Sequence, residues 1–252
     1  MASARSRAAL AELGGAGVPV LCATARRLRG AFGLLRENGL ALPVVGLNGA
    51  VGAFADGTRF HSTAFADGDG LAALRAFLHH HLPPCVYVDE PGVDVALPPE
   101  PATHPGHVAS LAGVTRTADP EATLRAQRVF QLAVLGRAHA ELAAVAAELG
   151  AAGIAHDLAP EPVWLPWGLT ATAPGVSKWA GVEAFGAATG ASLEGVVVVG
   201  DGTNDVPMLR RAARPVCVAD SRAAAAMPEA ETIPPPEADG WADLLPLLGV
   251  DG

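Results

Sequence analysis

The segment VVVVGDGTND at positions 196–205 constrains the fold of this 252-residue chain more than any other. An uninterrupted run of β-branched residues is typical of a strand that is buried on both faces in the middle of a parallel sheet. Open α/β sheets bind their ligands at the carboxyl ends of such strands, and Asp201 follows the strand at that end. Gly200 and Gly202 allow the backbone to turn sharply and to approach a ligand closely. The segment therefore predicts an α/β fold with a ligand site beside Asp201.

Asp201 and Asp205 lie on one loop and can face a common point. Two carboxylates at a strand end suit a hard cation with oxygen ligands, which in cells is most often Mg²⁺. The alternative is a polar turn in which Asp201 and Asn204 only bond nearby backbone groups. The valine strand favours the site. The chain has a net charge of −9, which is compatible with binding a divalent cation. A chain this acidic has no diffuse basic field of the kind that attracts nucleic acid or anionic lipid.

Helical and strand-like patterns alternate at both ends of the chain. The pattern predicts helices over 3–13, 26–38 and 177–189, and strands over 18–23, 43–46, 51–54, 59–61, 196–199 and 215–219. Asp56-Gly57 is typical of a tight hairpin turn. Alternation of this kind predicts a parallel α/β sheet.

The middle of the chain has a pattern of its own. It predicts helices over 70–81 and 138–149, strands over 86–89, 92–96, 129–135 and 163–172, and a Pro- and His-rich loop over 97–107. We therefore expect a discontinuous α/β core domain, residues 1–60 and 171–252, interrupted by an inserted α+β domain over 61–170. Half of the residues are apolar, as globular domains require.

Other polar residues also lie at predicted element boundaries. Thr24 follows an apolar run, where its hydroxyl could hold phosphate oxygens or cap the next helix. Arg26 could add a bidentate anion contact or be solvated. Lys178 opens a predicted helix, where the positive potential of the helix terminus disfavours a cation, so we expect an anion nearby unless it is a flexible surface lysine. Asn48-Gly49 by itself indicates only a turn.

The histidine run and the cysteines carry weaker signals. His79-His80-His81 is more readily explained as the polar end of an exposed helix than as a metal site, because adjacent histidines on a helix point in different directions. Cys22, Cys85 and Cys217 have neither zinc-ligand spacing nor an even number, which favours a reduced, cytoplasmic setting. No segment is typical of a transmembrane helix, and Glu12 interrupts the faint signal-peptide pattern at the N-terminus. We expect no membrane partner.

Four motifs occur in an order and approximate spacing that resemble the haloacid dehalogenase superfamily, and more narrowly its Cof-type sugar-phosphate phosphatases. They are CATAR at 22–26, NGA at 48–50, GVSKWAGV at 175–182 and GDGTNDVPML at 200–209. Asp239-Gly240, before the last predicted helix, also matches, so the resemblance runs from about Ser3 to Leu248. It implies a Rossmann-like parallel core sheet with an inserted α+β cap that closes over the substrate and selects it.

The resemblance implies hydrolysis of a small phosphorylated metabolite, such as a sugar phosphate, through an aspartyl-phosphate. Thr24 corresponds to the residue that holds the phosphoryl group, and Lys178 to the lysine that neutralises the phosphoryl charge and the nucleophile. The residues expected to bind substrate are Thr24, Ala25, Arg26, Asn48, Gly49 and Lys178. Such a reaction depends mostly on positioning and charge neutralisation.

The same resemblance implies a magnesium-dependent reaction. Asp201 corresponds to a metal ligand, and Asp205 supports the water molecules of the metal or the lysine. Asn204 lies in the same shell. The expected catalytic residues are Thr24, Lys178, Asp201, Asn204 and Asp205, and the expected metal ligands are Asp201 and Asp205.

One family motif is missing. In the family, the motif DxDGT ends the first strand and supplies the nucleophile and a metal ligand. It would precede the helix predicted over 3–13. The motif occurs nowhere in the 252 residues. We expect the chain as written to be inactive, and the natural protein to begin upstream with that strand. The alternatives are a catalytically dead relative that binds a phosphorylated ligand or a protein partner, and an ordinary α/β binding module. Because the absent strand lies between the strands over 18–23 and 196–199 in the family, a gap or a re-paired sheet is predicted there.

Overall fold

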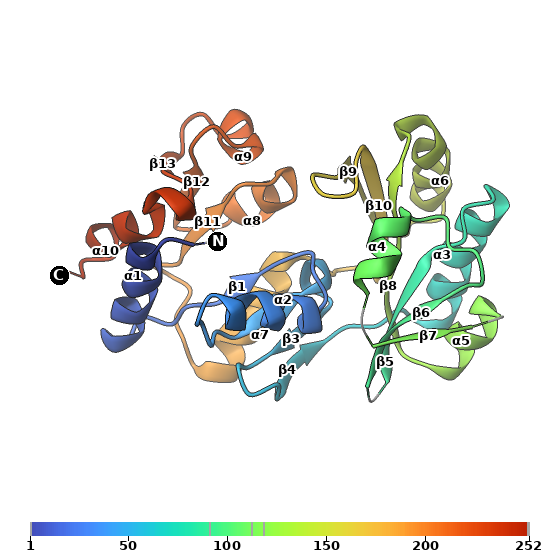
Figure 1. Cartoon of the computed structure of the whole chain (residues 1–252), viewed down its shortest axis with the longest axis horizontal. Coiled ribbons are helices and arrows are strands. Elements are labelled where there is room, and N and C mark those ends of the chain that lie inside the picture. Colours follow the sequence, from blue (N-terminus) through green and yellow to red (C-terminus); the bar gives the residue numbers. More distant parts are fainter. Residues whose placement is uncertain (1, 91, 112, 118, 251–252) are drawn as a thin grey trace. The chain divides into compact units, whose positions relative to one another are not determined.

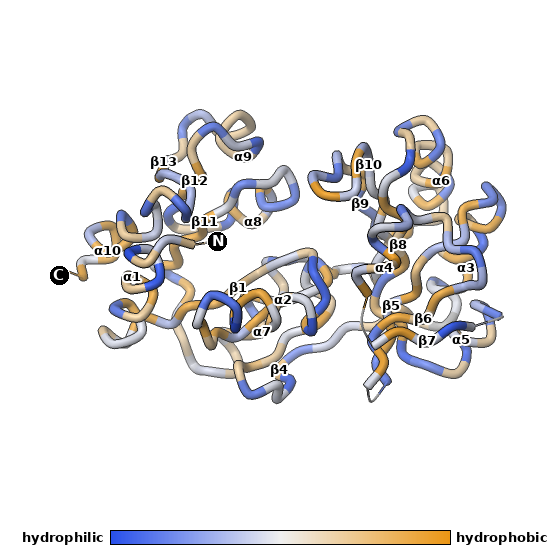
Figure 2. The backbone as a smooth tube through the Cα atoms, in the orientation of Figure 1, coloured by the Kyte–Doolittle hydropathy of each residue, from blue (hydrophilic) through white to orange (hydrophobic). Residues whose placement is uncertain are grey.

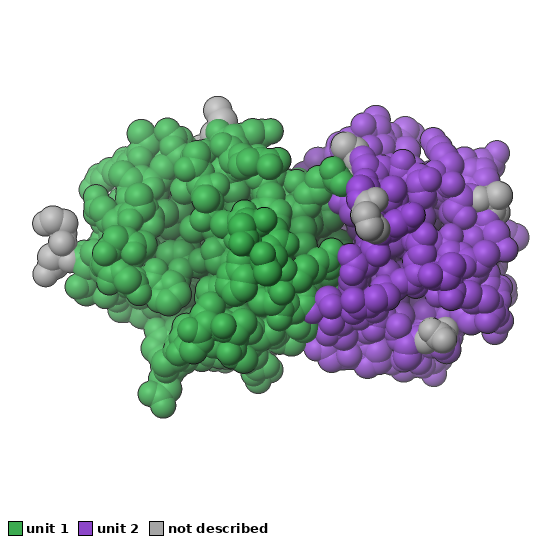
Figure 3. Space-filling view, turned by 90° about the horizontal axis from the view of Figure 1, so that it is seen from below, with its two compact units in different colours: residues 1–61, 177–252 green, residues 62–176 purple. Residues whose placement is uncertain are grey.

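The chain divides into two compact units. The computed structural model describes residues 2–90, 92–111, 113–117 and 119–250. Unit 1 comprises Met1–His61 and Ser177–Gly252, and unit 2 comprises Ser62–Val176 (Figure 3). The sequence pattern predicted an insert over 61–170, and the contacts within the chain extend it to Val176.

Unit 1 is the α/β unit and contains both ends of the chain. Its first half contains α1 (Ala4–Gly15), β1 (Cys22–Ala23), α2 (Leu28–Glu37), β2 (Val44–Gly46), the 3₁₀ turn η1 (Leu47–Gly49), β3 (Val51–Ala53) and β4 (Arg59–Ser62) (Figure 1). Its second half contains α7 (Lys178–Thr189), β11 (Val197–Gly200), η2 (Thr203–Asp205), α8 (Val206–Leu209), β12 (Arg214–Val218), α9 (Arg222–Ala226), β13 (Glu231–Ile233), η3 (Pro236–Ala238), η4 (Gly240–Asp243) and α10 (Leu244–Leu247).

The strands of unit 1 form two sheets. One has the order β1-β2-β3-β4 and the other the order β11-β12-β13. The β1–β2, β11–β12 and β12–β13 pairs are parallel, as the alternating pattern predicted, whereas β2 and β3 pair antiparallel. Asp56 accepts a hydrogen bond from the Thr58 N–H in the β3–β4 turn, as expected for a hairpin at Asp56-Gly57.

The valine strand lies at the edge of its sheet. We expected it to be central and buried on both faces, but β11 ends the sheet order and its residues Val197 and Val199 are only partly buried. The strand predicted over 18–23 is reduced to Cys22–Ala23, and β1 also ends its sheet. Within the described residues no strand pairing joins β1 to β11, which agrees with the predicted interruption between these two strands.

Side chains nevertheless connect the two edges. Leu21 and Ala23 pack against the cluster that contains Trp179 and Val198. Val18, Val20, Val197 and Val199 pack against a second cluster, which is built on Leu10, Leu13, Val216, Ile233 and Leu244. The two strand segments therefore share apolar cores although their backbones are not hydrogen-bonded to each other.

Unit 2 is the α+β unit. It contains α3 (Asp67–His79), β5 (Cys85–Glu90), β6 (Val93–Leu97), α4 (Pro105–Ser110), β7 (Val114–Arg116), α5 (Pro120–Ala126), β8 (Val129–Arg137), α6 (His139–Ala151), β9 (Ala155–Pro160) and β10 (Trp167–Thr172). Its sheet has the order β7-β6-β5-β8-β10-β9, and all pairs except β6–β7 are antiparallel. Figure 2 shows the hydrophobic stretches along β5 and β6.

The core of unit 2 lies between this sheet and its helices. It includes Phe77 of α3, Leu132 of β8 and Leu149 of α6, which are all fully buried. The expected loop over 97–107 is only partly correct, because α4 begins at Pro105. Proline presets the backbone angle of a first helical turn, and the His104 side chain accepts a hydrogen bond from the Gly106 N–H. Among the described residues, no helix is both long and apolar enough to cross a lipid bilayer.

Candidate functional site

A buried ion pair lies at the carboxyl end of β11. Lys178 Nζ donates to Asp205 Oδ1 over 2.6 Å, and the two side chains are only 7% and 9% exposed. Ser177 caps α7 by accepting from the Ala180 N–H, so Lys178 is the first residue of that helix. A lysine at this position was expected to have an anion nearby, and the anion is Asp205. The surface-lysine alternative is therefore wrong.

The second oxygen of Asp205 organises the loop after the valine strand. Asp205 Oδ2 accepts from the backbone N–H groups of Asp201 and Gly202, over 3.2 and 2.9 Å. Gly202 is tightly covered, because a Cβ there would lie 2.4 Å from Asn204 Oδ1. The carboxylate of Asp205 thus bonds on both oxygens, whereas Asp201 is exposed at the strand end. Asp201 is therefore the better placed of the two acids for a ligand that arrives from solvent.

Thr24 follows β1, and its backbone is hydrogen-bonded to β2 and to the turn that follows β2. Its N–H donates to Val45 O of β2 over 2.8 Å, and its carbonyl accepts from the Asn48 N–H over 3.1 Å. Thr24 Oγ1 accepts from the Arg26 N–H over 3.2 Å. It does not cap the following helix, because α2 begins at Leu28 with Arg27 at the cap position. The Thr24 hydroxyl therefore lies in a loop at the strand tip.

Gly49 brings this loop against the start of α7. Its φ is +110°, and a Cβ there would lie 1.9 Å from Ser177 O and 3.0 Å from Lys178 N. Only glycine can make so close an approach in this backbone conformation. Asn48 also has a positive φ, and its Oδ1 is a buried acceptor without a hydrogen-bond partner. Asn48-Gly49, which by itself indicated only a turn, is therefore part of the site.

These contacts form a continuous series through unit 1. Thr24 bonds Asn48, Gly49 touches Ser177, Lys178 pairs with Asp205, and Asp205 bonds the Asp201 backbone. The structure thus brings the four separated sequence motifs to one place. Ala25 and Arg26 are exposed beside Thr24, and their side chains take no part in this series.

Two neighbours of this site were not expected from the sequence. Ser177 makes the cap and the close contact with Gly49, and a serine before a helical pattern is the signal that could have identified it. His61, at the end of the hairpin, lies with its Nε2 3.0 Å from Gly49 O. No local pattern distinguishes His61, because the contact depends on how β4 is placed.

The charge of Lys178 also reaches β1. Burial raises the pKa of the Cys22 thiol, while the positive charge of Lys178 acts in the opposite direction and lowers it. Desolvation is the larger effect, so Cys22 is a neutral thiol below its raised pKa. Cys22 is therefore a packing residue next to the site, and its thiolate form is disfavoured.

The residues present fit a magnesium ion that keeps much of its water. Mg²⁺ is usually held by one or two carboxylates, together with water and the phosphate of a substrate. Asp201 offers an exposed carboxylate, and the oxygens of Asp205 are already engaged with Lys178 and with the loop backbone. The chemistry of the donor set therefore suits a hard cation bound chiefly through Asp201.

One protein-family model matches part of the chain. The model of the haloacid dehalogenase-like hydrolase family matches residues 163–245, a range that contains Lys178, Asp201 and Asp205. No curated protein matches the chain.

Similar folds occur among solved structures. A haloacid dehalogenase-like hydrolase from B. subtilis has a TM-score of 0.80 at 15% identity, with 98% of this chain and 93% of that chain covered. A phosphatase of the haloalkanoate (HAD) enzyme superfamily from Bacteroides thetaiotaomicron has a TM-score of 0.76 at 21% identity, with 99% and 88% covered. A HAD subclass IIB sugar phosphatase has a TM-score of 0.74 at 18% identity, with 99% and 92% covered.

The family match and the fold likeness differ in extent. The match lies on the segment that carries the ion pair and the strand-end carboxylate, and the fold likeness extends over nearly the whole chain. Residues 163–245 are therefore similar to the haloacid dehalogenase-like hydrolase family, and nearly the whole chain has a fold similar to solved structures named for that superfamily.

Proposed function

We propose that this chain is the scaffold of a magnesium-dependent phosphomonoester hydrolase of the Cof type. Its substrate would be a small phosphorylated metabolite, most simply a sugar phosphate. The observation that carries the proposal is the buried Lys178–Asp205 pair at the end of β11, joined through Gly49 to the Thr24 loop. A sugar phosphatase is among the proteins with a similar fold, which supports the substrate class.

Each residue of the series has a role in holding a phosphoryl group. Lys178 would neutralise charge on the phosphoryl oxygens, and Asp205 orients it through a bond of 2.6 Å. Thr24 would donate its hydroxyl to a phosphoryl oxygen, and the guanidinium of Arg26 could add a bidentate contact. The remaining proposed substrate-binding residues are Ala25, Asn48 and Gly49. The unpartnered Asn48 Oδ1 marks a polar side chain that a substrate hydroxyl could satisfy.

The proposed cofactor is Mg²⁺. Asp201 would hold it, with Asp205 and Asn204 bonding its water molecules. When bound, the ion would offset negative charge on the phosphoryl oxygens during transfer. The protein itself holds Lys178 and the strand-end loop in fixed positions, so that little reorganisation is needed as charge develops.

The nucleophile is proposed to be an aspartate on a further strand between β1 and β11. Two features of unit 1 support this placement. Both strands end their sheets, and the side chains of both segments pack into the same two apolar clusters. A parallel strand inserted there would deliver its carboxyl end beside Thr24 and Asp201. DxDGT does not occur in the 252 residues, so this aspartate would come from outside them.

We also propose a cytoplasmic location and a small anionic substrate. The three cysteines are free thiols, which supports a reduced, cytoplasmic location. The net charge of −9 supports a small anionic substrate held at one local site rather than nucleic acid or a membrane surface.

The first experiment uses the 252-residue chain. We expect no magnesium-dependent turnover of p-nitrophenyl phosphate or of sugar phosphates, because loss of a nucleophile removes several orders of magnitude in rate. Calorimetry should give weak magnesium affinity in the millimolar range, because few fixed oxygens converge. Turnover that disappears in Asp201→Asn would show instead that the 252 residues contain their own nucleophile.

The second experiment uses the chain extended by the codons that precede Met1 in frame. The extended protein should hydrolyse sugar phosphates, and Asp201→Asn and Lys178→Met should abolish the activity. Glu194→Gln, an exposed residue of unit 1, is the control and should keep it. A stop codon directly upstream, together with a stably folded inactive chain, would overturn the proposal and favour the catalytically dead relative.

A further inference from the structure

We infer that unit 2 contains a second metal site, built by His79, His80 and Glu148, that takes a divalent transition metal such as Zn²⁺. The ligand atoms of the three side chains lie within 4.8 Å of one another. These residues belong to α3, its C-cap and α6, and none of them takes part in the series of contacts around Lys178.

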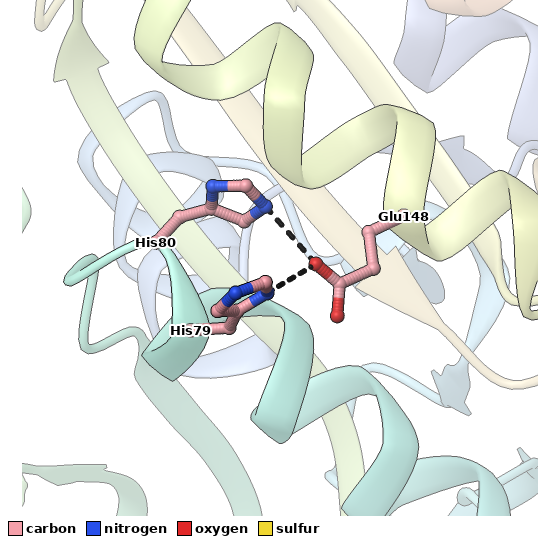
Figure 4. A group of neighbouring side chains, drawn as sticks. All are labelled: His79, His80 and Glu148. Carbon is pink, nitrogen blue, oxygen red and sulfur yellow. Dashed lines mark hydrogen bonds and ion pairs between the residues drawn. The ribbon is translucent and has the colours of Figure 1, made fainter.

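Both imidazoles point at one carboxylate oxygen (Figure 4). His79 Nδ1 lies 2.9 Å from Glu148 Oε2, and His80 Nε2 lies 3.0 Å from the same atom. A tetrahedral ion with ligand bonds of about 2.0–2.1 Å holds its ligand atoms roughly 3.3 Å apart. The two N–O distances are therefore close to the spacing that such an ion requires, and the two imidazole nitrogens lie within 4.8 Å of each other.

The end of α3 explains why two adjacent histidines can converge. The sequence indicated that they would point in different directions, which holds within a regular helix. The helix ends at His79, and the C-cap His80 has φ −91° and ψ 14°, which departs from helical geometry. His81 follows with a positive φ of 57° and is exposed. The break in the helix redirects the His80 ring toward Glu148.

The scaffold beneath the three side chains is rigid. Phe77 and Leu82 flank the histidines in sequence, Leu149 follows Glu148, and all three are buried in the core of unit 2. The ligand side chains themselves are accessible, with exposed fractions of 73% for His79, 28% for His80 and 38% for Glu148. An ion from solvent can therefore reach a site whose backbone is already in place.

The donor set selects the class of metal. Two imidazole nitrogens and one carboxylate oxygen suit Zn²⁺, Co²⁺ or Ni²⁺, whereas Mg²⁺ prefers oxygen ligands alone. Water would complete the coordination. Because the ligands come from α3 and α6, the ion would crosslink these two helices and stabilise unit 2.

The test is calorimetric titration of the full chain, made without a polyhistidine tag, with Zn²⁺ in the presence of excess Mg²⁺. We expect one zinc ion per chain with a micromolar dissociation constant, and a melting temperature that rises with zinc concentration. His80→Ala and Glu148→Gln should weaken binding by about 10–100-fold or more, since even outer-sphere losses cost that much. Far-UV circular dichroism checks that the variants fold.

His81→Ala is the matched control, because His81 is an exposed neighbour outside the cluster. It should bind zinc as the wild type does. The proposal is overturned if the wild-type chain binds no zinc at micromolar concentration, or if folded His80→Ala and Glu148→Gln bind it as tightly as His81→Ala. Substitution with Co²⁺ gives an independent readout, because two nitrogen ligands should give visible d–d absorption that His80→Ala diminishes.

Discussion

Gly49 shows how one residue can hold two parts of the site together. Gly49 has φ +110°, and a Cβ added there would lie 1.9 Å from Ser177 O. Gly175 has φ +80°, but a Cβ added there would have no atom within 4 Å. We expect Gly49→Ala to destabilise the protein by more than about 3 kcal/mol, since steric overlap adds to backbone strain. Gly175→Ala should lower the free energy of unfolding by only about 1–2 kcal/mol, because alanine would have to adopt a left-handed backbone conformation without any steric overlap. Urea unfolding of both variants measures the difference, and equal losses would contradict the close contact.

The Lys178–Asp205 pair is the buried electrostatic element of the site. Removing one partner leaves an uncompensated charge, so Lys178→Met and Asp205→Asn should each cost about 3–5 kcal/mol. The double variant should cost less than the sum of the two. Arg125→Ala breaks an exposed helical pair with Glu121 and should cost about 0.3–0.5 kcal/mol. A double-mutant cycle by urea unfolding measures these values, and strict additivity would mean that the pair is not coupled.

At the scale of elements, β1 and β11 each lie at the end of a sheet, as β4 and β13 do, whereas β2, β3 and β12 lie between two strands. Unpaired backbone groups at an edge exchange readily with solvent, whereas β12 is paired on both sides. The two short strands therefore depend on side-chain packing more than on the hydrogen-bond ladder. Both strands make apolar contacts with the core, but each is hydrogen-bonded to a neighbouring strand on one side only.

Hydrogen exchange tests that difference. Peptides covering 18–23 and 196–200 should exchange faster than the peptide covering 214–218, because only the last has partners on both sides. In a chain extended upstream of Met1, the first two peptides should gain protection if a strand inserts between them. Equal protection of all three peptides in the 252-residue chain would mean that the edges are paired in solution.

At the scale of the whole molecule, the two units have separate cores. Unit 2 is a single continuous segment, Ser62–Val176, with a six-stranded sheet and its own buried cluster. Unit 1 is assembled from two segments and has its strands in two sheets. A continuous segment with one core meets the conditions for folding alone.

Thermal unfolding of the full chain should therefore show two transitions. Unit 2 should give the one at higher temperature, because its sheet is continuous. The isolated fragment 62–176 should reproduce that transition by differential scanning calorimetry. A single cooperative transition, or an unfolded fragment, would mean that the two units depend on each other for stability.

Much of the local structure follows from short-range chemistry in the sequence. Ser177 and Gly190 bound α7 because serine caps a helix start and glycine adopts the left-handed conformation at its end. Asp56-Gly57 makes its turn for similar reasons. The GDGTND loop and Lys178 could be recognised as candidates because their residue types suit a phosphate and a hard cation wherever the chain places them.

Only the tertiary structure decided how these pieces meet. The sequence pattern of Val196–Val199 is that of a central strand, yet β11 lies at an edge, because centrality depends on a neighbouring strand and not on the valines themselves. The close approach of Gly49 to Ser177 and the convergence of His79 and His80 on Glu148 join residues distant in sequence. Local preference acts over a few residues, whereas such contacts depend on packing across the whole unit, and no short segment of sequence encodes that packing.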